Sequence, residues 1–217
     1  MKRIIYFFTV LILISCEIQY DGSSRYIAKT IVIDKDGVPI KDILVDISST
    51  RDNGNYADNI ASSFTDDEGS SIIFFPPLMK SGSYSIIINP KGGVYQTKSI
   101  SNIKLSDFEN YVFESGPIVL YENDDIVNFK IKLIPINDNH TIENIEIDAI
   151  SANDFVYYND LPNDNDHYPE QFFRILKNQN FNLSYTVRDY STSPVTSVNH
   201  IVNVSIGMES LTYELEY

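Results

Sequence analysis

The stretch VIDKDGVPIKDILVDI, residues 32–47, decides the fold expected for the first half of the chain. Its two ends are rich in isoleucine and valine, which favour β-strands. Between them Asp36-Gly37 supplies a tight turn in which glycine is free to adopt a positive φ, and Pro39 restricts the chain as it enters the second apolar segment. The stretch therefore predicts a strand, a turn and another strand.

Two further motifs follow along the chain. The segment TDDEGSSIIFF, residues 65–75, places a turn before an apolar strand, and the Asp66 carboxylate can accept hydrogen bonds from the backbone amides of that turn. In SGSYSIII, Tyr84 alternates with Ile86 and Ile88, so we expect these three side chains to point into the core. All these motifs specify a fold, and none specifies a site.

The remainder of the first half has the same pattern of short apolar segments with a period of two, separated by Asp, Asn, Gly and Pro. Seven strands in about a hundred residues predict a β-sandwich, in which two sheets bury their inner faces. The polar insertion at residues 51–59 is expected to form an exposed loop. The expected strands lie near Tyr26–Asp34, Ile43–Ser49, Ile60–Thr65, Ser70–Phe75, Ser83–Asn89, Tyr95–Leu105 and Tyr111–Tyr121.

Together, the three motifs resemble the carboxypeptidase regulatory-like (transthyretin-like) β-sandwich domains over about residues 26–100. The resemblance implies a non-catalytic accessory domain that acts as a spacer, an assembly module or a binding surface, and it carries over no functional residue. Three positions depart from the family pattern. Asp42 stands where the family usually has glycine, Ile72 and Ile73 stand where it usually has an aromatic residue, and Gly92 to Tyr95 contain an inserted valine.

The second half of the chain repeats the alternation of apolar and polar residues and predicts a second sandwich. Its last two expected strands are joined at Gly207 in an apparent hairpin. Residues 169–178 allow two interpretations, because Phe172, Phe173 and Leu176 have helical spacing but also fit a buried strand. The alternating segments are residues 124–136, 141–150, 181–190, 199–206 and 211–217.

The N-terminus has the layout of a signal peptide. Lys2 and Arg3 precede an uncharged run from Ile4 to Ile14, which as a helix would span about 17 Å, against about 30 Å for the hydrocarbon core of a bilayer. The run ends at LISC, residues 13–16, which resembles the lipobox of bacterial lipoproteins. The resemblance implies diacylglyceryl transfer to Cys16, cleavage before Cys16, and acylation of its amino group by a fatty acid such as palmitate.

We therefore expect an all-β chain with two consecutive antiparallel β-sandwich domains, of the Ig-like or transthyretin-like type, after a lipoprotein signal peptide. The expected boundaries are residues 1–15 for the signal peptide, 16–24 for the lipidated cysteine and its tether, 25–121 for the carboxypeptidase regulatory-like domain and 122–217 for the second sandwich.

An acylated Cys16 would make a lipid membrane the first partner and place the chain at the outer membrane or elsewhere in the cell envelope. The alternative for a lone cysteine is a small buried hydrophobe, but Cys16 lies between an apolar and a polar segment, where no core is available. Glu17 and Asp21 loosely resemble the acidic signals that send Bacteroidetes lipoproteins to the cell surface, so surface exposure is an open alternative.

The composition excludes several functions. The chain has 16 Lys+Arg and 30 Asp+Glu, and without residues 1–15 its net charge becomes −16, which disfavours a nucleic acid partner. Cys16 is the only cysteine, so once it is lipidated there is neither a disulfide nor a thiol nucleophile.

A calcium site is the one metal centre that the sequence suggests. Asp160, Asp164 and Asp166 alternate with asparagines in the longest polar loop and could supply oxygen ligands. The loop lacks the glycine and the closing glutamate of an EF-hand, so we prefer a solvated turn and expect neither metal nor cofactor.

No catalytic motif is present, and we expect no enzyme. The favoured function is a non-catalytic binding, adhesion or assembly module with a protein or glycan ligand. One alternative is carbohydrate binding, for which Tyr157-Tyr158 could stack on sugars. Another is a hydrolase with a dispersed active site, either a triad or a pair of carboxylates, and the histidines available to it are His140, His167 and His200. Assembly could use the terminal strand at residues 211–217 as an exposed sheet edge.

Overall fold

The computed structural model describes residues 20–51, 57–79, 81–152, 157–158 and 170–217, of which residues 157 and 158 are described by their backbone alone. The described residues form two compact units. Unit 1 comprises the chain up to Lys91 together with Thr97–Val119, and unit 2 comprises Gly92–Gln96 and Leu120–Tyr217. In the described residues, no helix is long and apolar enough to cross a membrane.

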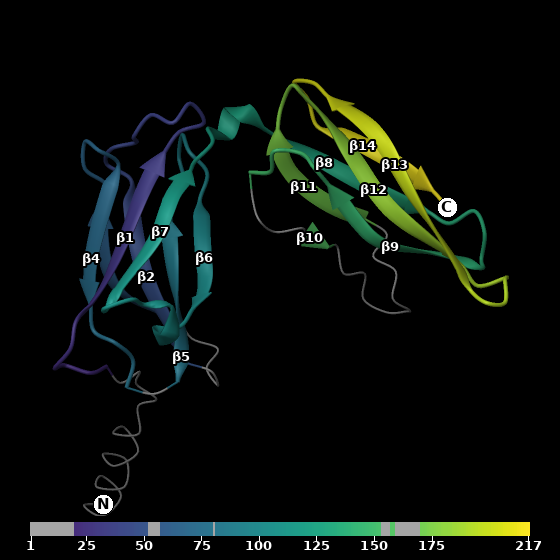
Figure 1. Ribbon diagram of the computed structural model, residues 1–217. Helices are drawn as coiled ribbons and strands as arrows, with labels where there is room; N and C mark the ends of the chain where they lie inside the picture. Colours follow the sequence, from purple (N-terminus) through teal and green to yellow (C-terminus); the bar gives the residue numbers. More distant parts are fainter. Residues whose placement is uncertain (1–19, 52–56, 80, 153–156, 159–169) are drawn as a thin grey trace, which may run out of the picture. The chain divides into compact units, whose positions relative to one another are not determined.

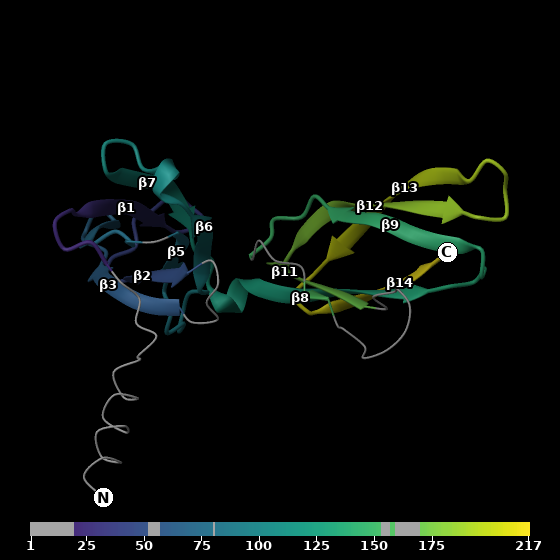
Figure 2. The ribbon, with the colours of Figure 1, turned by 90° about the horizontal axis from the view of Figure 1, so that it is seen from below.

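Unit 1 is a β-sandwich, as predicted (Figure 1). One sheet has the strand order β4-β1-β7 and the other has the order β3-β2-β5-β6. Figure 2 shows the two sheets as separate layers. The elements are β1 (Tyr26–Ile33), β2 (Leu44–Arg51), β3 (Ala57–Phe64), β4 (Ser70–Phe75), β5 (Gly82–Ile88), β6 (Lys98–Ile103), the 3-10 helix η1 (Leu105–Asp107) and β7 (Val112–Val119).

The core of unit 1 lies between these sheets. Tyr84, Ile86 and Ile88 are each at most 1% exposed, which confirms the prediction that they share the inner face of β5. At one end of the core Phe108 makes edge-on contacts with Tyr84 and other rings, with ring centroids 6.0 Å apart for this pair. Phe108 and the rings that it contacts cover the core at the end of the sandwich where β1 and β7 begin.

At the opposite end of unit 1, the motif at residues 65–75 forms hydrogen bonds with the motif at residues 32–47. The buried Thr65 hydroxyl donates a hydrogen bond to the Ile40 carbonyl (2.7 Å) and accepts one from the Ile43 amide (2.9 Å). As expected, the Asp66 carboxylate accepts hydrogen bonds from the amides of its turn, including that of Ser70 (2.9 Å). The second motif therefore holds the connection between the strands of the first.

The departure at Asp42 has a structural explanation. Its φ of 59° lies in the left-handed region, which glycine adopts most easily and which aspartate tolerates better than most residues. The position thus keeps the conformation that the family's glycine would favour. Gly37 also has a positive φ, 80°, as the predicted turn requires.

Unit 2 is a second sandwich, with sheets β10-β11-β8-β14 and β13-β12-β9 (Figures 1 and 2). Phe129, Ile131, Ile175 and Leu183 are fully buried between the sheets. The elements are the 3-10 helix η2 (Asn123–Asp125) and the strands β8 (Ile126–Ile134), β9 (His140–Ile147), β10 (Tyr157–Tyr158), β11 (Glu170–Leu176), β12 (Gln179–Asp189), β13 (Thr196–Ile206) and β14 (Leu211–Glu216).

The two units connect their strands in nearly the same way. The first strand of each unit, β1 or β8, lies between the fourth and the last strand, and the second, fifth and sixth strands are neighbours in the opposite sheet. The third strand differs, because β3 pairs with β2 whereas β10 pairs with β11. In both units the first and last strands pair in parallel, which departs from the purely antiparallel sheets that we expected.

The structure corrects two details of the second half and answers one open question. The hairpin expected at Gly207 is wrong, because β13 pairs with β12 whereas β14 crosses to the other sheet and pairs with β8. Residues 170–176 form a strand, so the helical alternative fails. Gln171, Phe173 and Ile175 face the core with the period of two that a strand requires.

Some strand ends of unit 1 also differ from expectation. β3 begins at Ala57, so the last part of the expected loop at residues 51–59 belongs to a strand, and residues 52–56 lie outside the described residues. β6 covers only Lys98–Ile103, because residues 92–96 turn away and pair with the start of unit 2 through Tyr95 and Glu122.

Candidate functional site

The principal residues singled out by the sequence fall outside the described part of the chain. Cys16 lies in residues 1–19, and Asp160, Asp164 and Asp166 lie in residues 159–169, so lipidation and calcium binding stay predictions. Within the described ranges there is no group of three or more His, Cys, Asp or Glu side chains that could hold a metal ion.

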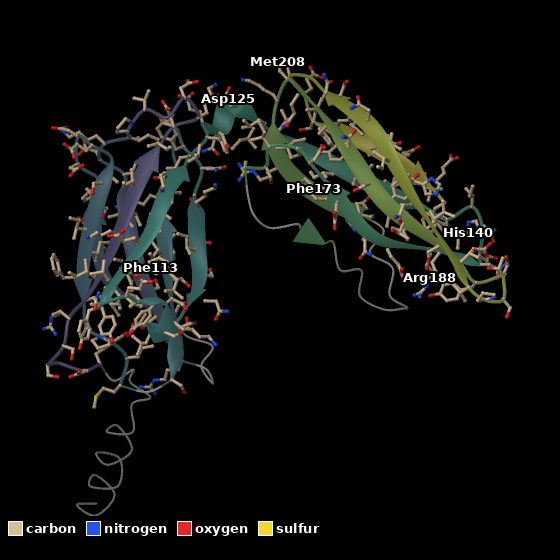
Figure 3. All side chains as sticks on the ribbon, viewed as in Figure 1. Phe113, Asp125, His140, Phe173, Arg188 and Met208 are labelled. Carbon is tan, nitrogen blue, oxygen red and sulfur yellow. The ribbon has the colours of Figure 1, made fainter. Side chains whose placement is uncertain are left out.

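The two described histidines are not arranged for nucleophilic catalysis. At the end of unit 2 where Figure 3 labels His140, its Nε2 lies 3.9 Å from an Asp189 carboxylate oxygen. The nearby Ser191 hydroxyl donates its hydrogen bond to Asp189 (2.6 Å), and this bond lowers the pKa of the Asp189 carboxyl. The Ser191 hydroxyl is therefore directed at a carboxylate and not at an imidazole nitrogen, which is the base that activates a serine nucleophile. His200 instead stacks on Tyr185, with ring centroids 5.0 Å apart.

The outer face of β13-β12-β9 is largely polar, although it also carries Ile201, which is 73% exposed. Asn180 pairs with Ser205 and Thr186 pairs with Asn199 through side-chain hydrogen bonds across the strands, the latter at 2.7 Å. Such cross-strand pairs stabilise the sheet. Tyr157 and Tyr158, the residues named for the carbohydrate-binding alternative, form β10, whose backbone pairs with β11.

The terminal strand lies at a sheet edge, as the assembly alternative requires. β14 pairs with β8 on one side and is the outermost described strand of its sheet. Its Glu214 forms an ion pair with Lys132 (2.8 Å), and Tyr217 is 4% exposed. The strand therefore completes its own sandwich, and charged side chains of this kind are common on protected edges.

The strongest candidate binding surface is the outer face of β4-β1-β7 in unit 1. Along β1, the side chains of Ala28, Thr30 and Val32 are buried, so the alternate positions point outward. We call this surface the apolar face, and its residues are Ile27, Ile31 and Ile33 of β1, Ile72 and Phe74 of β4, and Val112, Pro117 and Val119 of β7.

The strand register makes these side chains neighbours. Ile27 lies beside Phe74 on one side and beside Val112 on the other, and Ile31 lies beside Pro117. Phe74 is 62% exposed, and Ile72 and Ile31 are 49% and 43% exposed. Contiguous exposed apolar side chains on a sheet mark interaction sites more often than isolated ones do.

One ion pair crosses the middle of the apolar face. Lys29 Nζ lies 3.0 Å from Glu114 Oε1, in the row between Ile27 and Ile31. The pair is largely exposed and contributes little to stability. It leaves the centre of the face electrically neutral while offering one donor and one acceptor group to a partner.

Sequence reasoning missed the apolar face. The signal was present, because residues 72–75 read IIFF and residues 31–33 read IVI, without polar residues on alternate positions. Such runs usually indicate a strand that is buried on both faces. In the described structure only one face of each strand is covered, and the other face carries exposed apolar side chains such as Phe74 and Ile72.

Comparison with known proteins gives no family. Neither a family model nor a curated protein matches the chain. Among solved structures, the shaft pilin SpaA from Lactobacillus rhamnosus GG (D295N mutant) is 9% identical, with 89% of this chain and 98% of the pilin covered and a TM-score of 0.34.

Two enzymes have similarity of the same size. A 9R-lipoxygenase from Cyanothece PCC8801 is 13% identical over 54% of this chain (TM-score 0.34), and 3-chlorocatechol 1,2-dioxygenase from Rhodococcus opacus 1CP is 13% identical over 48% (TM-score 0.32). The chain spans only 20% of the lipoxygenase and 64% of the dioxygenase. Similarities this weak identify neither a family nor a function.

Proposed function

We propose that the chain is a lipid-anchored module of the bacterial cell envelope that binds a protein partner through the apolar face and catalyses no reaction. The observation that supports binding is the group of exposed apolar side chains on the outer face of one sheet, among them Phe74, Ile72 and Ile31. Adhesion and envelope assembly are both roles that such a module can fill.

The apolar face is large enough to matter energetically. Full burial of a Phe or Ile side chain contributes about 1.5–3 kcal/mol, and covering the exposed fractions of Phe74, Ile72 and Ile31 would therefore contribute about 2–5 kcal/mol in total. Phe74 accounts for about 1–2 kcal/mol of this, equivalent to roughly a 5–30-fold change in Kd. Substitution of this residue should have a measurable effect.

The charge of the chain favours a different protein over a second copy. With a net charge of −16 after Cys16 becomes the first residue, two copies repel each other, whereas a neutral or basic partner is attracted. Sedimentation of the purified chain at low and physiological ionic strength separates these cases. If the purified chain dimerises and Phe74→Asp dissociates the dimer, the occupant of the apolar face is a second copy of the chain and not a different protein.

Anchoring is proposed through Cys16. The supporting features are its position after an apolar run too short to span a bilayer and its resemblance to the lipobox. Intact-mass analysis of the protein from the membrane fraction of its native host should give a chain that begins at an acylated Cys16. An unmodified N-terminus would overturn the anchor. Protease treatment of intact cells is a separate experiment, which distinguishes a chain on the cell surface from one in the periplasm.

Partner binding is tested with a matched pair of substitutions. Phe74→Asp places a charge in the apolar face, whereas Phe64→Asp places one on the outer face of the opposite sheet of the same unit, where Phe64 is 60% exposed. We expect Phe74→Asp to weaken partner binding at least tenfold, by about 1–2 kcal/mol or more, and Phe64→Asp to leave it unchanged. Equal effects of the two substitutions would overturn the assignment of the face.

A further inference from the structure

The end of unit 1 at which the described chain begins carries its own exposed apolar residues. Met79 and Tyr111 are 63% and 60% exposed, and Leu105 is 38% exposed. We call these three residues the pole patch. Met79 follows β4, Leu105 follows β6, and Tyr111 precedes β7. The pairing of Tyr26 with Phe75 places the start of β1 beside the end of β4 at this end of the unit.

The pole patch is held in place by contacts within unit 1. Met79 and Leu105 line one hollow of about 420 Å³ together with Leu78 and Lys104. The Leu78 amide donates a short hydrogen bond to the buried Tyr84 hydroxyl (2.6 Å), which fixes the loop that carries Met79. The patch is therefore a built surface of the sandwich.

Tyr111 is fixed by a separate set of contacts. Its ring packs edge-on against Tyr26, with centroids 5.3 Å apart, and its carbonyl accepts a hydrogen bond from the Ile27 amide (2.9 Å). Its φ of 69° is uncommon for an aromatic residue. The exposed ring is thus presented by an ordered backbone.

The start of the described chain is attached at the same end. Tyr20 forms a β-bridge with Leu78, and its hydroxyl lies 2.7 Å from Ser49 Oγ. The Asp21 amide donates to the Pro77 carbonyl (2.8 Å). Tyr20 and Asp21, which belong to the segment expected to act as a tether, are therefore attached to unit 1.

This attachment limits the distance between unit 1 and the membrane. Three residues lie between Cys16 and Tyr20, and the four residue-to-residue steps that join them span at most about 14 Å when fully extended. A diacylglyceryl group on Cys16 would keep that residue at the level of the lipid headgroups. Because Tyr20 is bonded next to Met79, the pole patch would lie within reach of the same headgroups.

We infer that the pole patch rests in the headgroup region of the membrane to which Cys16 is anchored, so that the chain leaves unit 1 toward unit 2 from the end turned away from the lipid. The inference rests on the proposed anchor. Tyrosine and methionine suit this environment, because an aromatic ring with a hydroxyl prefers the interface and a thioether adapts to irregular surroundings. Lys104, Asp107 and Glu109 flank the patch, so the contact is expected on zwitterionic lipid and does not depend on anionic headgroups.

The chain lacks tryptophan, so a single introduced tryptophan reports its own surroundings. The test couples residues 16–217 through the Cys16 thiol to maleimide-headgroup lipid in phosphatidylcholine vesicles whose acyl chains are brominated near the headgroup. Met79→Trp is compared with Val38→Trp, a residue of 56% exposure at the opposite end of β1. We expect loss of emission and a shift to shorter wavelength for Met79→Trp and neither change for Val38→Trp.

A second variant tests the remaining residues of the patch. Leu105→Ser with Tyr111→Ser in the Met79→Trp background should restore much of the lost emission, while circular dichroism shows an unchanged fold. Equal emission from Met79→Trp and Val38→Trp on brominated vesicles would overturn the inference. The coupling to lipid is chemical and does not depend on acylation in the host. Failure of the emission test would therefore reject the lipid contact of the pole patch and not the acylation of Cys16. Conversely, an unmodified Cys16 in the host would reject the anchor, and the lipid contact could still be measured on vesicles.

Discussion

Replacing Thr65 by valine tests the contact between the two motifs that specify unit 1. The Thr65 hydroxyl is buried and makes two hydrogen bonds, one to the Ile40 carbonyl and one from the Ile43 amide. Valine has nearly the same shape, so Thr65→Val removes both bonds without a cavity. It leaves a buried carbonyl and a buried amide without their partner.

The size of the effect follows from these two groups. Each buried polar group that loses its hydrogen bond costs about 1–3 kcal/mol, so we expect Thr65→Val, which leaves two such groups, to lower the free energy of unfolding by about 2–6 kcal/mol. Thr30 provides a matched control, because it is also 2% exposed but its hydroxyl has no hydrogen-bond partner. Thr30→Val should therefore be neutral or stabilising by about 1 kcal/mol.

Differential scanning calorimetry of residues 17–217 measures both variants. For a domain of 60–100 residues 1 kcal/mol corresponds to about 4–8 °C in Tm, so the transition of unit 1 should fall by at least about 8 °C in Thr65→Val and should stay or rise in Thr30→Val. The transition of unit 2 serves as an internal control. Equal shifts in the two valine variants would refute the role assigned to the Thr65 hydroxyl.

Three further predictions address the backbone, the N-terminal segment and the strand topology. Gly69→Ala should destabilise unit 1 by more than about 2 kcal/mol in urea unfolding, since its Cβ would lie 2.3 Å from the Val32 carbonyl oxygen at a φ of +69°, whereas Gly37→Ala meets open space and should cost only about 1 kcal/mol. The hydroxyl and amide of Ser23 donate hydrogen bonds to the Asp21 carboxylate and lower its pKa below the usual 3.8. The stabilising effect of this turn is therefore complete above that pH and should be lost as the pH falls below it. The loss should be measurable as faster amide exchange at Ser23. Pulling unit 1 from the start of β1 and the end of β7 loads a parallel strand pair in shear. Pulling from the start of β1 and the end of β4 instead opens an antiparallel pair from one end. Force spectroscopy should therefore give a higher unfolding force in the first geometry.

The sequence predicted the fold of unit 1 well where local chemistry determines the backbone. The Asp36-Gly37 turn, the Asp66 turn and the inward alternation of Tyr84 with its neighbours depend on residues close together in the chain, and the structure confirms them. Asp42 shows the same logic, because a left-handed turn accepts aspartate in place of glycine.

The errors arose where pairing depends on distant residues. The segment around Gly207 looks like a hairpin locally, but the place of β14 beside β8 is decided by burial of Leu215 in the core of unit 2. Periodicity also cannot tell which face of an apolar strand is covered. The apolar run at residues 72–75 therefore predicts a strand without indicating that Phe74 and Ile72 are exposed and form the proposed binding surface.

The most direct test of the central claim is site-specific photo-crosslinking in membranes of the native host, with a photoreactive phenylalanine at position 74 or at position 64. The account predicts a discrete protein adduct from position 74 that is absent from position 64, and the purified adduct partner should bind the unmodified chain and lose at least tenfold in affinity with Phe74→Asp. The same adducts from both positions, or a partner whose affinity is indifferent to Phe74→Asp, would contradict it.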